Sequence, residues 1–293
     1  MAGKILVSGA PGKVGTELVR LLANRGVQLR VLVHHVERSG EVSHPGVEVV
    51  EGDLTDAAGM RGALRGVETL FLASSASDGQ VAVQAAAIEA AVEAGVGRVV
   101  KLSAYGAAEG SSVPFLDWHG QTEETLRRSG ARWTLIRPYL YMQTLLMNVP
   151  TIQAQAAIFN CGDGSRIPFI DARDVAECAA AVLTSDGHDG AVYELSGPAS
   201  LTWPEVAASI GAMLGRSVRY VPVTADAMAT ALSESGMPAW LVNSLVALMK
   251  FHKRDGGRVT RTVDTLTGRP ARALAVFLRD YAPAFESGQP ARA

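Results

Sequence analysis

The sequence predicts an α/β protein with a doubly wound parallel sheet, and three observations support this fold class. Short apolar runs alternate with helical patterns through residues 1–138, the order expected for right-handed crossovers between parallel strands. The apolar runs are continuous rather than alternating, as in strands that are buried on both faces. The first run leads directly into three closely spaced glycines and then a helix, so the chain begins with a strand–turn–helix corner.

The first half of the chain contains predicted strands with helices between them. The strands are the apolar runs at residues 5–7, 27–33, 47–50, 69–73, 98–102 and 133–137. The helices show helical periodicity or a closing glycine, and they span residues 14–24, 56–65, 80–94 and 117–129. Pro138 is expected to end the last of these strands, because proline has no N–H for the sheet.

After Pro138 the alternation of short strands and helices is lost. Residues 139–155 have helical stretches that Pro150 is expected to break. Asp171 is a suitable N-cap for the next helix, and Thr202 with Glu205 has the spacing of a capping box. The remaining predicted elements are a helix at residues 171–183, strands at 191–195 and 219–223, and helices at 228–235, 239–251 and 274–281.

The glycines of the corner have the spacing G-x-x-G-x-x-G. Gly9 permits a tight turn, Gly12 lets the backbone approach a pyrophosphate, and Gly15 lets the helix pack close to the strand. The helix N-terminus offers N–H groups and partial positive charge to phosphates. The context favours a dinucleotide-binding site over the alternative, a purely structural turn. The predicted site comprises Gly9, Ala10, Pro11, Gly12, Lys13, Val14 and Gly15.

The residues after the second strand bear on the choice of cofactor. An acidic residue at this place binds the ribose hydroxyls of NAD, whereas a cationic residue suits the 2′-phosphate of NADP. Here the strand is followed by His34 and His35, with Arg38 shortly after and Glu37 nearby. The sequence therefore favours NADP and leaves NAD open; the alternative is that both histidines are merely exposed loop residues.

Further cofactor contacts are expected where other strands end, because ligands bind at the carboxyl edge of such sheets. Asp53 and Leu54 would flank the adenine, and Ser74 and Ser75 would lie near the nicotinamide ribose. The full set predicted beyond the corner and the histidine segment is Asp53, Leu54, Ala73, Ser74, Ser75, Ser103 and Tyr139.

Composition excludes several classes of function. The 293 residues carry a net charge of −2, so nothing indicates nucleic acid or an anionic membrane as a partner. Cys161 and Cys178 form neither a disulfide framework nor a zinc motif, and we expect no metal. The chain shows neither a signal peptide nor an apolar run of about 18 residues. We expect a cytoplasmic protein that binds a small apolar molecule, and the sequence leaves a homodimer open.

Several motifs in this order resemble the NmrA-like branch of the atypical short-chain dehydrogenases. They are G-A-P-G-K-V-G at 9–15, G-D-L-T-D at 52–56, H-G-Q-T-E-E-T-L-R-R-S-G at 119–130, W-T-L-I-R-P at 133–138, R-D-V-A at 173–176 and L-T-G-R-P at 266–270. That family contains NADP-dependent quinone, azo-dye and triphenylmethane-dye reductases, as well as regulators that bind the dinucleotide. The resemblance implies a Rossmann domain at residues 1–150, with the helix at 171–184 packing on it. A smaller α/β domain at 151–293 would then cover the substrate.

The resemblance also has departures that affect the chemistry. Ordinary short-chain dehydrogenases carry Tyr-x-x-x-Lys, but Tyr105 is followed at this spacing by Glu109. In several relatives a lysine stands where this chain has His119. The catalytic candidates are therefore His119, Tyr105 and Ser103. Imidazole titrates near neutral pH, so His119 could protonate the anion left by hydride transfer, and Tyr105 could hydrogen-bond the same atom. The alternative is that His119 only packs or caps its helix.

These features together predict an NADP-dependent reductase that passes hydride to a flat apolar acceptor such as a quinone, an azo compound, an enone or a ketone. A regulator that senses the dinucleotide without turnover is one alternative. A biosynthetic ketoreductase, dehydratase or isomerase on the same scaffold is another.

Overall fold

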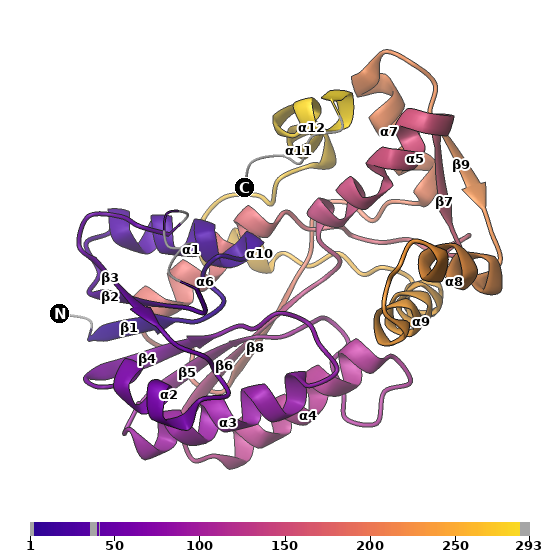
Figure 1. Ribbon diagram of the computed structural model, residues 1–293. Coiled ribbons are helices and arrows are strands. Elements are labelled where there is room, and N and C mark those ends of the chain that lie inside the picture. Colours follow the sequence, from indigo (N-terminus) through magenta and orange to yellow (C-terminus); the bar gives the residue numbers. More distant parts are fainter. Residues whose placement is uncertain (1–2, 36–39, 41, 288–293) are drawn as a thin grey trace. The chain divides into compact units, whose positions relative to one another are not determined.

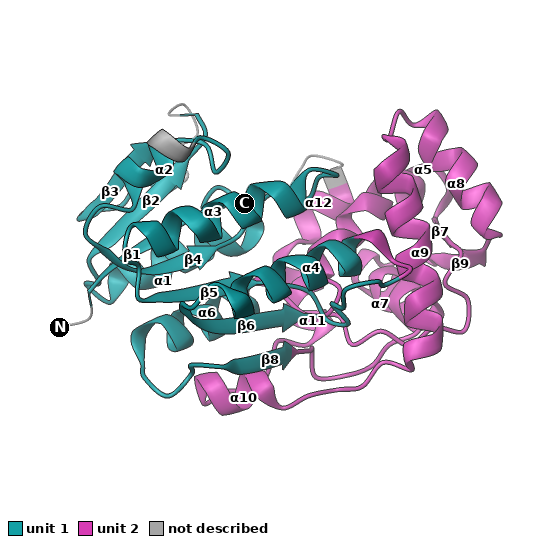
Figure 2. Cartoon of the chain, turned by 90° about the horizontal axis from the view of Figure 1, so that it is seen from below, with its two compact units in different colours: residues 1–111, 115–138, 173–194 teal, residues 112–114, 139–172, 195–293 magenta. Residues whose placement is uncertain are grey.

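The computed structural model describes residues 3–35, 40 and 42–287, apart from the side chains of residues 57, 58 and 287. The chain divides into two compact units (Figure 2). Unit 1 comprises residues 1–111, 115–138 and 173–194, and unit 2 comprises residues 112–114, 139–172 and 195–293.

A seven-stranded sheet organises unit 1 (Figure 1). Its order is β3-β2-β1-β4-β5-β6-β8, and the pairs from β3 to β6 are parallel. This order of the first six strands is the one that binds dinucleotides in doubly wound sheets, which confirms the predicted fold class. The strands are β1 (Lys4–Val7), β2 (Leu29–Val33), β3 (Val47–Glu51), β4 (Val67–Leu72), β5 (Arg98–Leu102), β6 (Arg132–Pro138) and β8 (Ala191–Leu195).

Helices cover both faces of this sheet (Figure 1). They are α1 (Lys13–Asn24), α2 (Ala57–Ala63), α3 (Gln80–Glu93), α4 (Pro114–Arg128) and α6 (Ala172–Thr184). One core cluster joins the sheet to α2, α3 and α4 through residues such as Leu6, Met60, Ile88 and Leu126, all at most 1% exposed. Helix α1 and α6 lie on the opposite face. Helix α4 begins three residues before the predicted position, because Pro114 starts its first turn rather than preceding it in a loop.

Unit 2 is mainly helical, with one two-stranded parallel sheet, β7 (Ala157–Asn160) with β9 (Arg219–Pro222). The capping box at Thr202 and Glu205 is confirmed at the start of α7. The predicted break at Pro150 is confirmed, because one helical stretch ends at Asn148 and α5 begins at Val149 with this proline in its first turn, where its missing N–H costs nothing. The helical elements are η2 (Met142–Asn148, a 3₁₀ helix), α5 (Val149–Gln155), α7 (Trp203–Leu214), α8 (Ala225–Glu234), α9 (Ala239–Asp255), α10 (Thr262–Thr267), α11 (Leu274–Asp280) and α12 (Ala282–Ser287).

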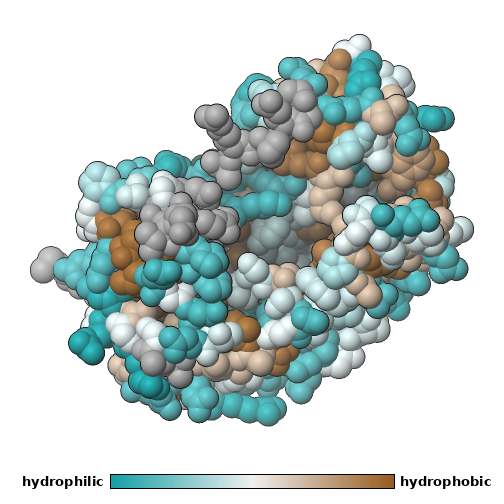
Figure 3. Space-filling view, viewed as in Figure 1, coloured by the Kyte–Doolittle hydropathy of each residue, from teal (hydrophilic) through white to brown (hydrophobic). Residues whose placement is uncertain are grey.

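Residues 139–150, which the predicted boundary at 150 assigns to the first domain, fall in unit 2. The reason is packing, since Met142, Leu145 and Val149 belong to the core cluster that α7 and α11 complete. Met147 is 55% exposed instead. Apolar side chains also gather on the face of unit 2 at the upper right of Figure 3, in the region of α5 and α7.

None of the helices within the described residues is both long enough and apolar enough to cross a membrane.

Candidate functional site

The glycine corner connects β1 to α1 through close backbone contacts that leave no room for a side chain at Gly9 or Gly15. Gly9 adopts a left-handed conformation, with φ of 63°. A Cβ atom on Gly15 would lie 2.3 Å from the carbonyl oxygen of Gly9 and 2.6 Å from the Cα of Ala10. Gly12 is the N-cap of α1, with extended backbone and no side-chain cap. The first amides of α1 therefore have no side-chain acceptor at this cap, and the corner has the form of an anion-binding cradle.

A buried hydroxyl joins this corner to the end of β4. Ser8 Oγ lies 2.8 Å from the carbonyl oxygen of Ala73 and accepts a hydrogen bond from the Ala73 N–H at 2.9 Å. A Cβ on Gly9 would meet that same carbonyl oxygen at 2.9 Å. The structure thus brings predicted cofactor residues from the two strand ends side by side. Beyond them, Ser74 accepts a hydrogen bond from the buried Gln84 of α3 at 2.8 Å.

The two histidines after β2 form an exposed stacked pair, with ring centroids 4.4 Å apart. His34 Nε2 lies 3.5 Å from a carboxylate oxygen of Asp53, which follows β3. The Thr55 backbone N–H donates to Asp53 at 2.8 Å and, as the main cause, lowers the pKa of that carboxyl group. His34, His35 and Asp53 therefore share one edge of the sheet, as predicted, and Arg38 lies outside the described residues. Leu54 packs against the core of unit 1.

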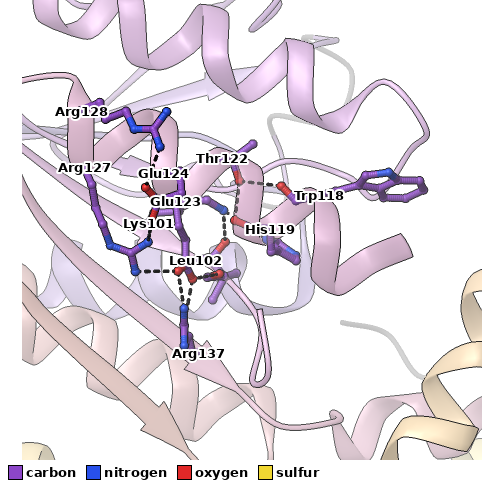
Figure 4. Close-up of polar contacts among 11 residues, drawn as sticks. Lys101, Leu102, Trp118, His119, Thr122, Glu123, Glu124, Arg127, Arg128 and Arg137 are labelled. Atoms are coloured by element: carbon purple, nitrogen blue, oxygen red, sulfur yellow. Dashed lines mark hydrogen bonds and ion pairs between the residues drawn. The ribbon is translucent and has the colours of Figure 1, made fainter. Parts of the chain in front are cut away.

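A polar cluster lies where β5 meets α3 and α4 (Figure 4). Lys101 of β5 is fully buried, and its Nζ lies 3.1 Å from Nδ1 of His119 on α4. Gln80 of α3 places its Nε2 3.4 Å from the same ring nitrogen. Burial lowers the pKa of Lys101 to about 7. Burial, followed by the charges of Lys101 and Arg137, lowers the pKa of His119 well below its usual value. Near pH 7 His119 is therefore a neutral imidazole.

A second buried group, the carboxylate of Glu123, lies one turn further along α4. It accepts a hydrogen bond from Ser103 Oγ at 2.5 Å and forms ion pairs with Arg137 and, at 2.9 Å, with Arg127. The carboxylate raises the pKa of Arg137. The hydroxyl of the predicted catalytic residue Ser103 is thus engaged by Glu123, which holds the end of β5 to α4. A direct role of Ser103 in catalysis or cofactor binding stays a prediction.

The two predicted tyrosines lie in different units. Tyr105 follows β5 in unit 1, and its backbone N–H donates to the carbonyl of Pro138 at 2.9 Å. Tyr139 belongs to unit 2 and is 2% exposed. Its hydroxyl donates to Asp255 at 3.0 Å, and its ring stacks on His252. A contact between Tyr139 and a cofactor also stays a prediction.

The sequence interpretation did not single out Lys101 or Glu123. A signal existed for each, because Lys101 interrupts the apolar run Val99–Leu102, and Glu123 lies one helical turn after His119 on the same face. A charged residue in a strand that is otherwise apolar is uncommon, because burial of a charge is costly.

The profile of the NmrA-like family matches residues 1–275. The chain belongs to the NmrA-like family. It is 36% identical over 282 residues to an NAD(P)H azoreductase of Xenophilus azovorans, covering 96% of this chain and 99% of that protein. It is also 36% identical over 286 residues to the (4-alkanoyl-5-oxo-2,5-dihydrofuran-3-yl)methyl phosphate reductase of Streptomyces griseus, covering 96% and 99%.

Among solved structures, the chain is similar to the NADPH-dependent quinone oxidoreductase of Escherichia coli in complex with NADPH. The TM-score is 0.87 at 28% identity, over 94% of this chain and 99% of that one.

Proposed function

We propose that this protein is an NADPH-dependent reductase that transfers hydride to a flat apolar acceptor, such as a quinone, an azo compound or an enone. The observation that carries the proposal is the 36% identity to an NAD(P)H azoreductase over 96% of the chain. The glycine corner supports it independently, because a Cβ on Gly15 would collide with the backbone of Gly9 and Ala10. The cradle therefore fits the diphosphate of a nicotinamide cofactor.

The residues of the sheet edge have distinct roles in this proposal. The amides of residues 9–15 hold the pyrophosphate. In this proposal the stacked His34 and His35 contact the 2′ position of the adenosine ribose, and no acidic residue follows β2 immediately. This arrangement favours a 2′-phosphate over a free hydroxyl, so NADPH is the preferred cofactor. Ala73, Ser74 and Ser75 line the path toward the nicotinamide.

NADPH supplies a hydride, and the acceptor that receives it becomes an anion. His119 donates a proton to that anion, and Tyr105 donates a hydrogen bond to the same atom. The N–H of a neutral imidazole can hydrogen-bond that anion, and it can give up its proton provided that the other ring nitrogen gains a proton in the same step. Ser103 orients the end of β5 through Glu123. We place the reaction in the cytoplasm, consistent with a sequence whose two cysteines give no disulfide framework.

The test is oxidation of NADPH, followed by absorbance, in the presence of a quinone, an azo dye and an enone, with NADH measured in parallel. The proposal expects acceptor-dependent oxidation and a stoichiometric reduced product with at least one acceptor class. His119→Ala should lower kcat by about 100-fold or more, within the range of general acid catalysis, while the Kd of NADPH stays unchanged. Tight binding of NADPH without turnover of any acceptor would contradict the proposal and favour a sensor of the dinucleotide.

A further inference from the structure

Lys101 and His119 form a buried pair of two bases. The lysine Nζ contacts His119 Nδ1 at 3.1 Å and the carbonyl oxygen of Leu102 at 3.4 Å. Within the described residues no carboxylate lies within ion-pair distance of Lys101, because Glu123 is engaged by Ser103, Arg127 and Arg137 (Figure 4). A methionine would fill a similar volume without the cost of burying a charge, so packing alone does not account for a lysine here.

The contact decides which nitrogen of His119 carries the hydrogen. A lysine ammonium has three donors and no acceptor, so Nδ1 must accept. The Gln80 amide places a second donor 3.4 Å from the same nitrogen. The hydrogen of the neutral ring therefore lies on Nε2. Among the described residues of unit 1, no hydrogen bond engages Nε2, and His119 is half-buried. The ring consequently presents an N–H that is available to a substrate.

The charges around the pair come from three elements. Glu123 on α4 raises the pKa of Lys101, Arg137 on β6 lowers it, and burial lowers it most, to about 7. The pKa of His119 lies well below its usual value. Gln80 of α3 adds no charge. Below about pH 7 the pair therefore holds one extra proton, and it resides on the lysine.

We propose that Lys101 is the positioning residue and proton reserve of His119. The step rests on the reductase function proposed above. When the acceptor has received hydride, the Nε2–H bond of His119 breaks and a bond from that proton to the acceptor anion forms. At the same time an N–H bond of the Lys101 ammonium breaks and an Nδ1–H bond forms. The products are neutral lysine, neutral histidine in the other tautomer and a neutral reduced acceptor. Water then returns a proton to Nε2, and Nδ1 returns its proton to Lys101.

The first measurement needs neither a variant nor a substrate. In protein labelled with ¹⁵N-histidine, the ring nitrogen shifts of His119 report the tautomer at a pH below 7, where Lys101 is protonated. The proposal expects a protonated Nε2 and an unprotonated Nδ1. Protonation at Nδ1 in the wild-type protein would overturn it. In Lys101→Met the preference should weaken, because only the Gln80 amide remains near Nδ1, and the Nδ1-protonated tautomer should become populated. Gln80→Leu is the matched control, since it removes the weaker donor and should leave the wild-type tautomer.

The second measurement is the pH profile of kcat with NADPH and an acceptor. In the wild type kcat should fall as pH rises through about 7, because the reserve proton is lost. Lys101→Met should lower kcat by about 100-fold and remove this limb of the profile, with the KM for NADPH unchanged. An unchanged profile in Lys101→Met would show that the lysine is only structural. If His119 has the expected tautomer but no acceptor is reduced, the proposed reductase function is wrong, and the proton transfer proposed here is wrong with it. The contact geometry of Lys101 and His119 would still be correct.

Discussion

Replacing Gly12 with alanine should separate cofactor binding from folding. Gly12 has φ of −86° and ψ of 168°, a conformation that alanine adopts without strain. Its added Cβ would meet one atom, the carbonyl oxygen of Gly9, at 3.0 Å. The same Cβ would stand in front of the first amides of α1, where the pyrophosphate approaches.

The expected magnitudes follow from these contacts. Loss of a hydrogen bond to a charged phosphate costs about 2 kcal/mol, which weakens NADPH binding about 30-fold. The free energy of unfolding should change by less than about 1 kcal/mol, because the small clash is offset by a stiffer unfolded chain. Gly15→Ala should behave in the opposite way. Its Cβ would lie 2.3 Å from backbone, so overpacking should cost about 2–3 kcal/mol of stability.

The assay pairs calorimetric titration of NADPH with thermal unfolding of the same samples. Gly62→Ala in α2 is the matched control, because nothing lies within 4 Å of its added Cβ. This variant should bind NADPH normally and gain about 0.5–1 kcal/mol from helix propensity. If Gly12→Ala bound NADPH as tightly as the wild type, the corner would be only a structural turn and the reasoning would be refuted.

Three further perturbations test the electrostatics of unit 1. The double variant with alanine at His34 and His35 should raise the Kd of NADPH about 10-fold and the Kd of NADH less than 2-fold, with His44→Ala as the control. An equal loss of affinity for both cofactors would show that the histidines do not select the 2′-phosphate. Glu123→Gln should lower the free energy of unfolding in urea by about 2–3 kcal/mol, because it removes the carboxylate that is paired with Arg137 and leaves Arg127 with Glu124 alone; a loss below about 1 kcal/mol would contradict this. Lys101→Met should be more stable than the wild type at pH 7. Because the folded pKa of Lys101 is lowered from 10.5 to about 7, the unfolded chain binds more protons, so wild-type stability rises with pH and the gap should narrow toward pH 10. A gap that is constant with pH would be inconsistent with this lowered pKa.

The sheet of unit 1 was predictable because its signals are local. Continuous apolar runs identified the strands, and the glycine spacing identified the turn from the first strand into the first helix. The start of one helix was predicted wrongly at a proline, because α4 begins at Pro114 and not at residue 117. Pro114 and Pro150 each sit in the first turn of a helix, but the same residue in a helix interior would end it. Only the packing of the following residues distinguishes the two cases.

The candidate site was predictable only in part, because its contacts join residues distant in the chain. The edge that carries His34 and Asp53 follows from strand order, since parallel strands end together. The partner of Tyr139 lies more than a hundred residues away at Asp255, and no local pattern points to it. Ser103 was expected to face a ligand, yet its hydroxyl donates to Glu123. The direction of a side chain at the end of a strand depends on the helix that packs beside it, here α4.

The division of charge between Glu123 and Lys101 argues for function at this site. If Lys101 served only to neutralise the buried carboxylate, the two groups would be in contact, and removal of both would be nearly neutral. Instead Glu123 forms ion pairs with Arg127 and Arg137. Lys101 contacts the imidazole of His119, which carries no negative charge. Stability would be served better by an apolar side chain at position 101. Lys101 is buried, its pKa lies near neutral pH, and its Nζ contacts Nδ1 of His119. These properties suit Lys101 to proton transfer.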